Sequence, residues 1–287
     1  MKTLRQVLSN ARRDGVAVGH FNVSELAALK AIVAAARELK LPVMIGVSEG
    51  ERGFTGVKQI AALIRCYREE SAYPIFLNAD HTHSLEKAEQ AARAGFDEII
   101  FDGSSLPFEE NVTQTKKAVE LIKSIKPDCM VEGEIGYIGS SSDVVDKVPE
   151  GIGAMTTPEE AKQFVAATGV DILAPAVGNM HGLLQSMVSG EVQKRLDIER
   201  IAALRDATRI FMTLHGGSGT NDEDFKRAIH AGMTIVHVNT EIRLAWRRAM
   251  EASLGADQSV VPYKILVPVV AAIQKVVEAR LRLFSSK

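Results

Sequence analysis

The chain has 287 residues, 46% hydrophobic and 24% charged, so it can bury a large core and lacks the composition of a disordered protein. Its formal net charge of −2 argues against a nucleic-acid partner, because binding a phosphate backbone requires a basic surface. No segment approaches the roughly eighteen apolar residues of a membrane span, and the N-terminus does not resemble a secretion signal, so we expect a cytoplasmic protein without membrane contacts.

Short runs rich in Val, Ile and Phe alternate along the chain with longer segments of helical periodicity. This alternation is typical of repeated βα units around a parallel sheet. The runs predict strands at residues 16–23, 42–48, 74–80, 98–103, 130–136, 172–177, 210–215 and 235–240. Eight such strands predict the α/β fold class, as a (β/α)8 TIM barrel with additional N- and C-terminal helices that forms a single domain over residues 1–287.

The predicted helices have recognisable ends. Residues 1–13 read as an amphipathic helix, and later helices are predicted to begin at the N-caps Ser24, Ser84 and Thr157. Left-handed C-caps are predicted at Gly95, Gly169 and Gly232. Two helices, at residues 241–254 and 264–284, follow the last strand, and the second is a candidate for oligomerisation.

Two cysteines, Cys66 and Cys129, lack the close spacing of a zinc or redox pair. We predict that both are buried thiols, which fits a reducing compartment.

Polar residues stand at the C-terminal end of every predicted strand. In chain order they are Asn22, Ser48, Asp80 with His81, Asp102, Glu134, His181, His215, and Asn239 with Thr240. The strand ends of a barrel converge on one cavity, so these side chains are expected to meet.

Three of these residues, His81, His181 and His215, have the pattern of a catalytic zinc-type site with an open position for substrate. His83 is an alternative to His81, but it lies further along the turn. The remaining histidines, His20, His230 and His237, are interpreted as structural.

Three carboxylates accompany the predicted metal ligands. Asp80 could exchange a proton with a substrate hydroxyl, or it could orient a histidine from the second shell. Asp102 and Glu134 could be outer ligands, a second metal position or partners of the histidines.

The glycine-rich segment 215–219 follows the seventh predicted strand, and Asn239 and Thr240 follow the eighth and open a helix. Glycine lets backbone N–H groups approach an anion, and a helix start adds positive potential. This location therefore predicts phosphate binding.

The chain resembles the class II, metal-dependent fructose-bisphosphate aldolases and their tagatose-bisphosphate relatives over nearly its whole length. The resemblance is carried by FNV at Asn22, PVMIGVSEG at Ser48, NADH at Asp80, IFDGS at Asp102, VEGEIGYIG at Glu132 and Glu134, TTPEEAKQFVAATGVD, GNMHG at His181, LHGGSG at His215 and VNTE at Asn239.

The resemblance implies reversible cleavage of a ketose bisphosphate, typically to dihydroxyacetone phosphate and glyceraldehyde 3-phosphate, in glycolysis and gluconeogenesis. By this resemblance three histidines bind Zn²⁺ or another divalent metal, Asp80 acts on the C4 hydroxyl, and Asp102 and Glu134 lie near the metal, including an alternative position. The residues implied to contact substrate, its phosphate or a monovalent cation (Na⁺ or K⁺) are Asn22, Ser48, Gly182, Gly216, Gly217, Ser218, Asn239 and Thr240. A homodimer or homotetramer is also implied.

The sequence departs from the family pattern at two places. The mobile loop usually carries a glutamate that moves a proton on dihydroxyacetone phosphate, whereas the matching stretch here is Ser140 to Asp143, so Asp143, Asp146 or Glu150 would have to substitute. His237 stands where the family commonly has an asparagine.

Other functions compete with this one. A lysine Schiff base is disfavoured because no predicted strand end carries lysine. The His81-Thr82-His83 motif resembles that of amidohydrolases, but it follows the third strand rather than the first. An aldolase for tagatose bisphosphate or another ketose phosphate, and a non-catalytic sugar-phosphate sensor, stay open.

Overall fold

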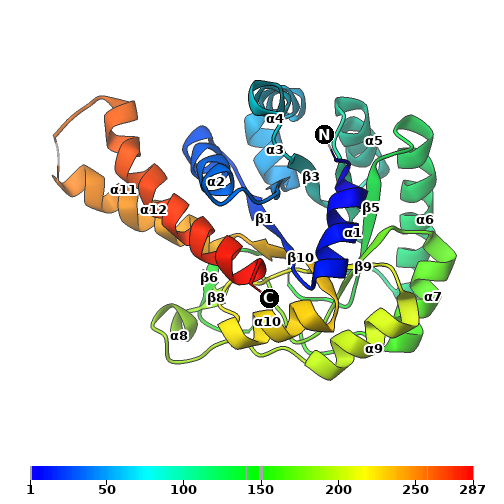
Figure 1. Cartoon of the computed structure of the whole chain (residues 1–287). Helices are drawn as coiled ribbons and strands as arrows, with labels where there is room; N and C mark the ends of the chain where they lie inside the picture. Colours follow the sequence, from blue (N-terminus) through cyan, green and yellow to red (C-terminus); the bar gives the residue numbers. More distant parts are fainter. Residues whose placement is uncertain (1, 140, 149–150, 257, 287) are drawn as a thin grey trace.

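Among the described residues, eight parallel strands close into a barrel in the order β1-β10-β9-β7-β5-β4-β3-β2 (Figure 1). The computed structural model describes residues 2–139, 141–148, 151–256 and 258–286. The barrel strands are β1 (Val18–Asn22), β2 (Val43–Val47), β3 (Ile75–Thr82), β4 (Glu98–Phe101), β5 (Met130–Ile135), β7 (Ile172–Pro175), β9 (Phe211–Leu214) and β10 (Met233–Val238). The predicted TIM barrel and all eight of its strands are confirmed.

Helices surround the barrel, and two of them project from it as a hairpin (Figure 1). They are α1 (Leu4–Asp14), α2 (Leu26–Leu39), α3 (Glu49–Thr55), α4 (Val57–Ser71), α5 (Leu85–Ala94), α6 (Phe108–Ile125), α7 (Pro158–Thr168), α8 (Gln185–Val188), α9 (Ile198–Thr208), α10 (Asp222–Ala231), α11 (Thr240–Ala256) and α12 (Pro262–Phe284). The projecting hairpin consists of α11 and α12. Of the helices described, none has the length and apolar character needed to cross a bilayer.

The barrel interior is built in layers, because alternate residues of each strand point inward. The layer nearest the N-terminal ends of the strands is apolar and packs against Leu4, Val7 and Leu8 of α1. This helix therefore closes the N-terminal end of the barrel. The inward residues of this layer are Val18, Met44, Phe76, Met130, Ile172, Phe211 and Ile235. Two positions further along, five of these seven strands carry buried polar residues instead: His20, Asn78, Glu132, Thr213 and His237.

The loop between β5 and α7 contains a short strand. Its two-residue strand β6 (Val144–Val145) pairs in parallel with β8 (Leu183–Leu184), which follows His181. This small sheet ties the predicted mobile loop to the segment that carries a predicted metal ligand.

Two predicted helix ends need correction. Ser24 does not cap α2; Glu25 does, because its carboxylate accepts hydrogen bonds from the backbone N–H groups of Ala27 and Ala28. A carboxylate is favoured there by the positive end of the helix dipole. Gly95 and Gly169 are left-handed C-caps as predicted, but Gly232 ends α10 with φ +135°, outside the left-handed helical region.

The prediction for the cysteines is half right. Cys129 is buried, whereas Cys66 is exposed on α4. Cys66 lies on the outer face of its helix.

The start of α7 allows a stability prediction. Thr157 and Glu160 form a reciprocal capping box, each side chain accepting from the other's backbone N–H. Thr157→Ala removes one acceptor and should lower the free energy of unfolding by about 1 kcal/mol. Urea unfolding should show a lower midpoint for this variant and a nearly unchanged one for Thr157→Ser. Equal midpoints for all three proteins would contradict the assignment.

Candidate active site

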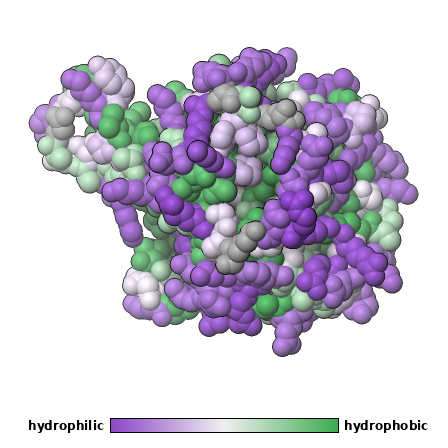
Figure 2. Space-filling model, in the orientation of Figure 1, coloured by the Kyte–Doolittle hydropathy of each residue, from purple (hydrophilic) through white to green (hydrophobic). Residues whose placement is uncertain are grey.

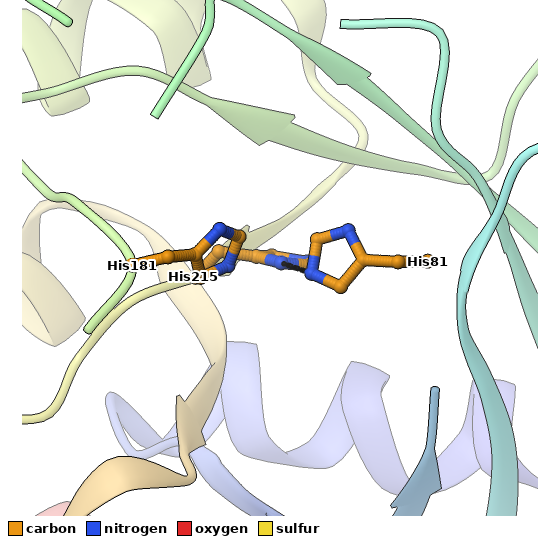
Figure 3. Close-up of side chains that lie close together, drawn as sticks. All are labelled: His81, His181 and His215. Carbon is orange, nitrogen blue, oxygen red and sulfur yellow. Dashed lines mark hydrogen bonds between the residues drawn. The ribbon is translucent and has the colours of Figure 1, made fainter. Parts of the chain in front are cut away.

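Three histidines, His81, His181 and His215, face one another at the C-terminal end of the barrel (Figure 3). His81 lies in β3, His181 follows β7 and His215 directly follows β9. Their ring centroids are 4.7 to 5.8 Å apart, and one ring nitrogen of each lies within 4.8 Å of the others. The sequence prediction that these distant residues meet agrees with this geometry, whereas His83 is exposed and lies outside the cluster.

In each of the three rings, one of the two nitrogens is hydrogen-bonded to a protein oxygen. For His81, His181 and His215 in turn, the acceptors are Asp102 Oδ2 at 2.8 Å, the Gly139 carbonyl oxygen at 2.6 Å and Glu132 Oε1 at 2.7 Å. Donating a proton to these acceptors leaves a lone pair on His81 Nε2, His181 Nε2 and His215 Nδ1. Such outer partners fix the tautomer and orientation of metal-binding histidines.

The spacing of these nitrogens fits a metal ion. His81 Nε2 lies 3.3 Å from His215 Nδ1. Two nitrogens bound tetrahedrally to zinc at about 2.0–2.1 Å would be separated by about 3.3–3.4 Å. Without a cation or an added proton, two lone pairs would face each other here. The donor set and its spacing therefore suit a divalent ion with an open position.

Nearby carboxylates also favour a positive charge in the cluster. Burial lowers the pKa of His81, but Asp80 and Asp102 more than offset this and raise that pKa well above its usual value. Burial, with His81 and His215 as further causes, lowers the pKa of His181 to about 3, so this ring is neutral and able to act as a ligand.

His81 has a backbone conformation that is rare for a residue with a side chain. Its φ is +39°, and the register between β3 and β4 shifts after Ala79. A buried arginine supports this strained strand end: Arg52 donates to the Val47 and Asp80 carbonyls and to Thr82 Oγ1. Backbone strain of this kind persists only where surrounding contacts enforce it, and it concentrates at functional sites.

Asp80 places an unpaired carboxylate oxygen beside the histidines. Its Oδ2 accepts from Asn22 Nδ2 at 2.8 Å, while its buried Oδ1 has no hydrogen-bond partner among the described residues. That free oxygen lies 3.6 Å from His81 Nε2 and 3.7 Å from His237 Nδ1. Burial raises the pKa of Asp80, but the three neighbouring histidines and Asn22 outweigh it, so the pKa falls below its usual range and the group is ionised.

A second carboxylate, Glu134, lies on the other side of His81. Its buried Oε2 lies 3.5 Å from His81 Nδ1 and 3.8 Å from His215 Nδ1, and in the part of the chain that the structure describes it has no hydrogen-bond partner. Burial and the nearby Asp102 raise its pKa to about 8. His81, Asp102 and Glu134 form another group with metal-ligand spacing, so the predicted second metal position is geometrically feasible.

Two openings meet above the histidines. A cavity of about 340 Å³ is lined by Ser48, Asp80, His81, Asp102 and Asp143, among others. A narrower cleft beside it is lined by most residues predicted to bind substrate or phosphate, namely Asn22, Gly182, Gly216, Ser218, Asn239 and Thr240. Gly217 does not line this cleft among the described residues; its N–H donates to the His237 carbonyl. An apolar cavity of about 410 Å³ at the other end of the barrel contains none of these residues.

Several residues that shape the site were not among the predicted site residues. Glu132 holds His215 and also accepts from Thr213 Oγ1 at 2.6 Å. His237, interpreted as structural, lines the cleft; its ring stacks on His20 at 3.4 Å and on His215 at 4.1 Å between centroids. Alternate residues of a strand point to the same side of the sheet. Because Glu132 and His237 each stand two positions before a predicted site residue, Glu134 and Asn239, this spacing could have identified them.

Comparison with known proteins agrees with this geometry. The family model for class II fructose-bisphosphate aldolase matches residues 2–287. A fructose-bisphosphate aldolase from Geobacillus stearothermophilus is 36% identical, over 99% of this chain and 96% of its own length, and one from Staphylococcus aureus is 33% identical over 99% and 97%. The chain belongs to the class II fructose-bisphosphate aldolase family. The crystal structure of the YdjI aldolase from Escherichia coli superposes with a TM-score of 0.83 at 29% identity, covering 98% of this chain and 96% of that one.

Class II aldolases are generally metal-dependent, and the histidine cluster is where the described residues of this family member could hold the ion. The loop that departs from the family pattern borders the same site. Ser141, Ser142 and Asp143 line the larger cavity, and Thr240 Oγ1 donates to the Ser142 carbonyl at 3.0 Å. Asp146 does not line this cavity, and Ser140 and Glu150 lie outside the described residues.

Proposed function

We propose that this chain is a zinc-dependent fructose-bisphosphate aldolase. It cleaves fructose 1,6-bisphosphate reversibly to dihydroxyacetone phosphate and glyceraldehyde 3-phosphate, in glycolysis and gluconeogenesis. One observation carries the proposal: the open three-histidine cluster lies beside the partnerless Oδ1 of ionised Asp80. The family membership of the chain and the aldolase names of its relatives support the same reaction.

The bound divalent ion would supply a Lewis acid that stabilises the negative charge developing on substrate oxygens as the C–C bond breaks. His81, His181 and His215 would hold it. Asp80 Oδ1 would take the proton from the substrate hydroxyl, while Asn22 holds Oδ2 and so orients the carboxylate. In the reverse direction Asp80 would return the proton to the aldehyde oxygen as the C–C bond forms, which gives the new hydroxyl.

Asp102 and Glu134 would also act near the metal ion. Asp102 orients His81, and it also accepts from the backbone and side chain of Ser104. Glu134 has a free buried oxygen that could ligate the ion in an alternative position. Because burial raises the pKa of Glu134 to about 8, this ligand would gain its charge when a cation arrives.

The narrow cleft would bind a substrate phosphate. Gly182, Gly216 and Ser218 line it together with Asn239 and Thr240. Thr240 opens the 17-residue helix α11, whose N-terminus favours an anion. Gly216 has φ +59°, and a Cβ added there would lie 2.3 Å from the Met180 carbonyl oxygen, so only glycine fits. Ser48, on the wall of the adjoining cavity, would contact a substrate hydroxyl.

Asp143 is the proposed replacement for the missing loop base, because it lines the cavity, whereas Asp146 does not. Asp143→Ala should lower turnover by about 100-fold, the lower end of the effect of a general base. Asp146→Ala is the matched control and should retain turnover. Proton exchange at C3 of dihydroxyacetone phosphate, followed by NMR in deuterated water, measures the step directly. Unchanged exchange in Asp143→Ala would remove this assignment.

A substrate panel tests the proposed function. Fructose 1,6-bisphosphate, tagatose 1,6-bisphosphate and shorter ketose phosphates are incubated with the protein, before and after chelation of metal. We expect rapid release of dihydroxyacetone phosphate that fructose 1,6-bisphosphate supports best and that chelation abolishes. Faster cleavage of another ketose phosphate would identify that compound as the substrate in place of fructose 1,6-bisphosphate. Tight binding without cleavage would favour the sugar-phosphate sensor instead.

We propose that the chain folds as a single domain, which the hydrogen bond from Ala17 N–H to the Phe284 carbonyl supports by joining the last helix to the first strand. We further propose a homodimer or homotetramer that forms through α11 and α12. Large apolar side chains are exposed on this hairpin, including Val260 and Tyr263, and Figure 2 shows hydrophobic atoms on it. Two unpaired cysteines are compatible with a cytoplasmic location.

A further inference from the structure

A buried lysine lies directly behind the proposed phosphate cleft. The Nζ of Lys194 donates to three backbone carbonyl oxygens, those of Met180 at 2.6 Å, Gly182 at 2.7 Å and Gly216 at 2.9 Å. The lysine is 4% exposed. Met180 and Gly182 flank His181, and Gly216 follows His215, so one ammonium group joins the two loops that carry these histidines.

The backbone of Lys194 is fixed as firmly as its side chain. Its N–H donates to the Gly219 carbonyl at 2.9 Å, and Lys194 forms an isolated parallel bridge with Thr220. The backbone of this residue is therefore hydrogen-bonded to the segment that follows β9. A side chain anchored at both ends loses little further entropy when substrate binds.

The number of acceptors matches the protonated form of lysine. An ammonium group has three N–H donors, whereas a neutral amine has two. Burial lowers the pKa of Lys194 to about 7, and Glu241 acts in the opposite direction. An arriving phosphate dianion would raise that pKa again, because an opposite charge stabilises the ammonium form.

Three inward-pointing carbonyl oxygens around one positive charge also form the kind of cage that binds an alkali-metal ion. Carbonyl oxygens are suitable ligands for hard cations. The family resemblance implies a Na⁺ or K⁺ ion beside Gly182 and Gly216. In the structure the ammonium of Lys194 occupies the point on which both carbonyls converge.

We propose that Lys194 is a built-in monovalent cation of the phosphate-binding end, and that it replaces a bound Na⁺ or K⁺ in this protein. Gly182 and Gly216 contribute carbonyls to the lysine and also line the cleft, so its charge lies next to the proposed phosphate position. Lys194 is thus a positioning residue, which holds both loops and lowers the electrostatic cost of binding the dianion. This inference rests on the proposed function, because it assigns a charge to the same site.

Removal of the ammonium should create a cation requirement that the natural protein lacks. The cleavage rate of the unaltered protein should be the same in sodium, potassium and tetramethylammonium buffers. Lys194→Ala should raise the KM for the phosphorylated ketose about tenfold or more, as expected for the loss of charge-assisted hydrogen bonds. Added K⁺, Na⁺ or ammonium should restore most of this loss. Lys194→Met fills the cage with an apolar chain and should resist such rescue.

Binding of thallium(I), a heavy substitute for K⁺, tests the cage without any activity measurement. Crystals of Lys194→Ala soaked in thallium(I) should show an anomalous peak among the Met180, Gly182 and Gly216 carbonyls, and the unaltered protein should show none there. This test distinguishes failure of the inference from failure of the proposed function, since it requires no turnover.

Several results would overturn the inference. One is a thallium peak in this cage of the unaltered protein, or a dependence of its cleavage rate on Na⁺ or K⁺. Another is an equal rise of KM in Lys194→Ala and Lys194→Met that added cations do not reverse. That result would show that the lysine only joins the two loops. If Lys194→Ala does not fold, the cation dependence and thallium binding of the unaltered protein still decide the question.

Discussion

His181→Ala should lower kcat/KM for ketose bisphosphate cleavage by about 1,000-fold or more, with loss of the bound metal ion. Lewis-acid stabilisation by a metal is worth several kcal/mol, and each 1.4 kcal/mol or so is a factor of about ten in rate. His181 is the best of the three ligands to change. Its second nitrogen is hydrogen-bonded to the backbone carbonyl of Gly139, whereas that of His215 is hydrogen-bonded to the buried carboxylate of Glu132, which the variant would leave without this partner.

The measurements are steady-state kinetics and metal content of the purified variant by mass spectrometry. His83→Ala is the matched control, because His83 is exposed and lies outside the cluster. The control should keep both its metal and its activity. Full turnover by His181→Ala, or loss of metal in His83→Ala instead, would show that the ligand set is misassigned.

Asp80→Asn should lower kcat by about 100- to 10,000-fold while the metal stays bound, because general acid–base groups contribute rate factors of that size. Asparagine preserves the size of the side chain but cannot accept a proton from the substrate. The partnerless Oδ1 of Asp80 is the atom in question, since Asn22 already engages Oδ2.

Three readouts separate this role from an indirect one: kcat, KM and metal content. A loss confined to kcat identifies a group that acts in the chemical step. Asp206→Asn on α9 is a control, because that carboxylate is exposed and forms an ion pair with the neighbouring Arg205. If Asp80→Asn instead loses its metal and keeps its kcat after zinc is restored, Asp80 merely orients a histidine.

Strand ends were the part of the site that sequence predicted best. Barrel topology sends every C-terminal strand end to one cavity, so polar residues at 80, 134 and 215 could be grouped without knowledge of the helices. The same period-two rule would also have found Glu132, His20 and His237, each two residues below a predicted site residue. His20 and His237 were instead interpreted as structural, and Glu132 was named only as part of the motif that it shares with Glu134.

Other features depend on three-dimensional contacts that local patterns do not encode. Lys194 lies in a loop between α8 and α9, far from any strand end, and its long side chain reaches back to the carbonyls around two ligands. The absence of lysine at strand ends therefore said nothing about lysine near the site. Ser24 and Glu25 can both accept hydrogen bonds from the first backbone N–H groups of a helix, so the local sequence does not decide between them. In the structure the chain enters α2 in such a way that Glu25 is the cap.

Anomalous diffraction at the zinc absorption edge, from crystals grown with zinc, tests the central claim most directly. The account predicts a peak bound at about 2.0–2.1 Å by His81 Nε2, His181 Nε2 and His215 Nδ1, with Asp80 beside it and one position open. A peak at other residues, or histidine rings that turn away from one another while zinc is present, would contradict it.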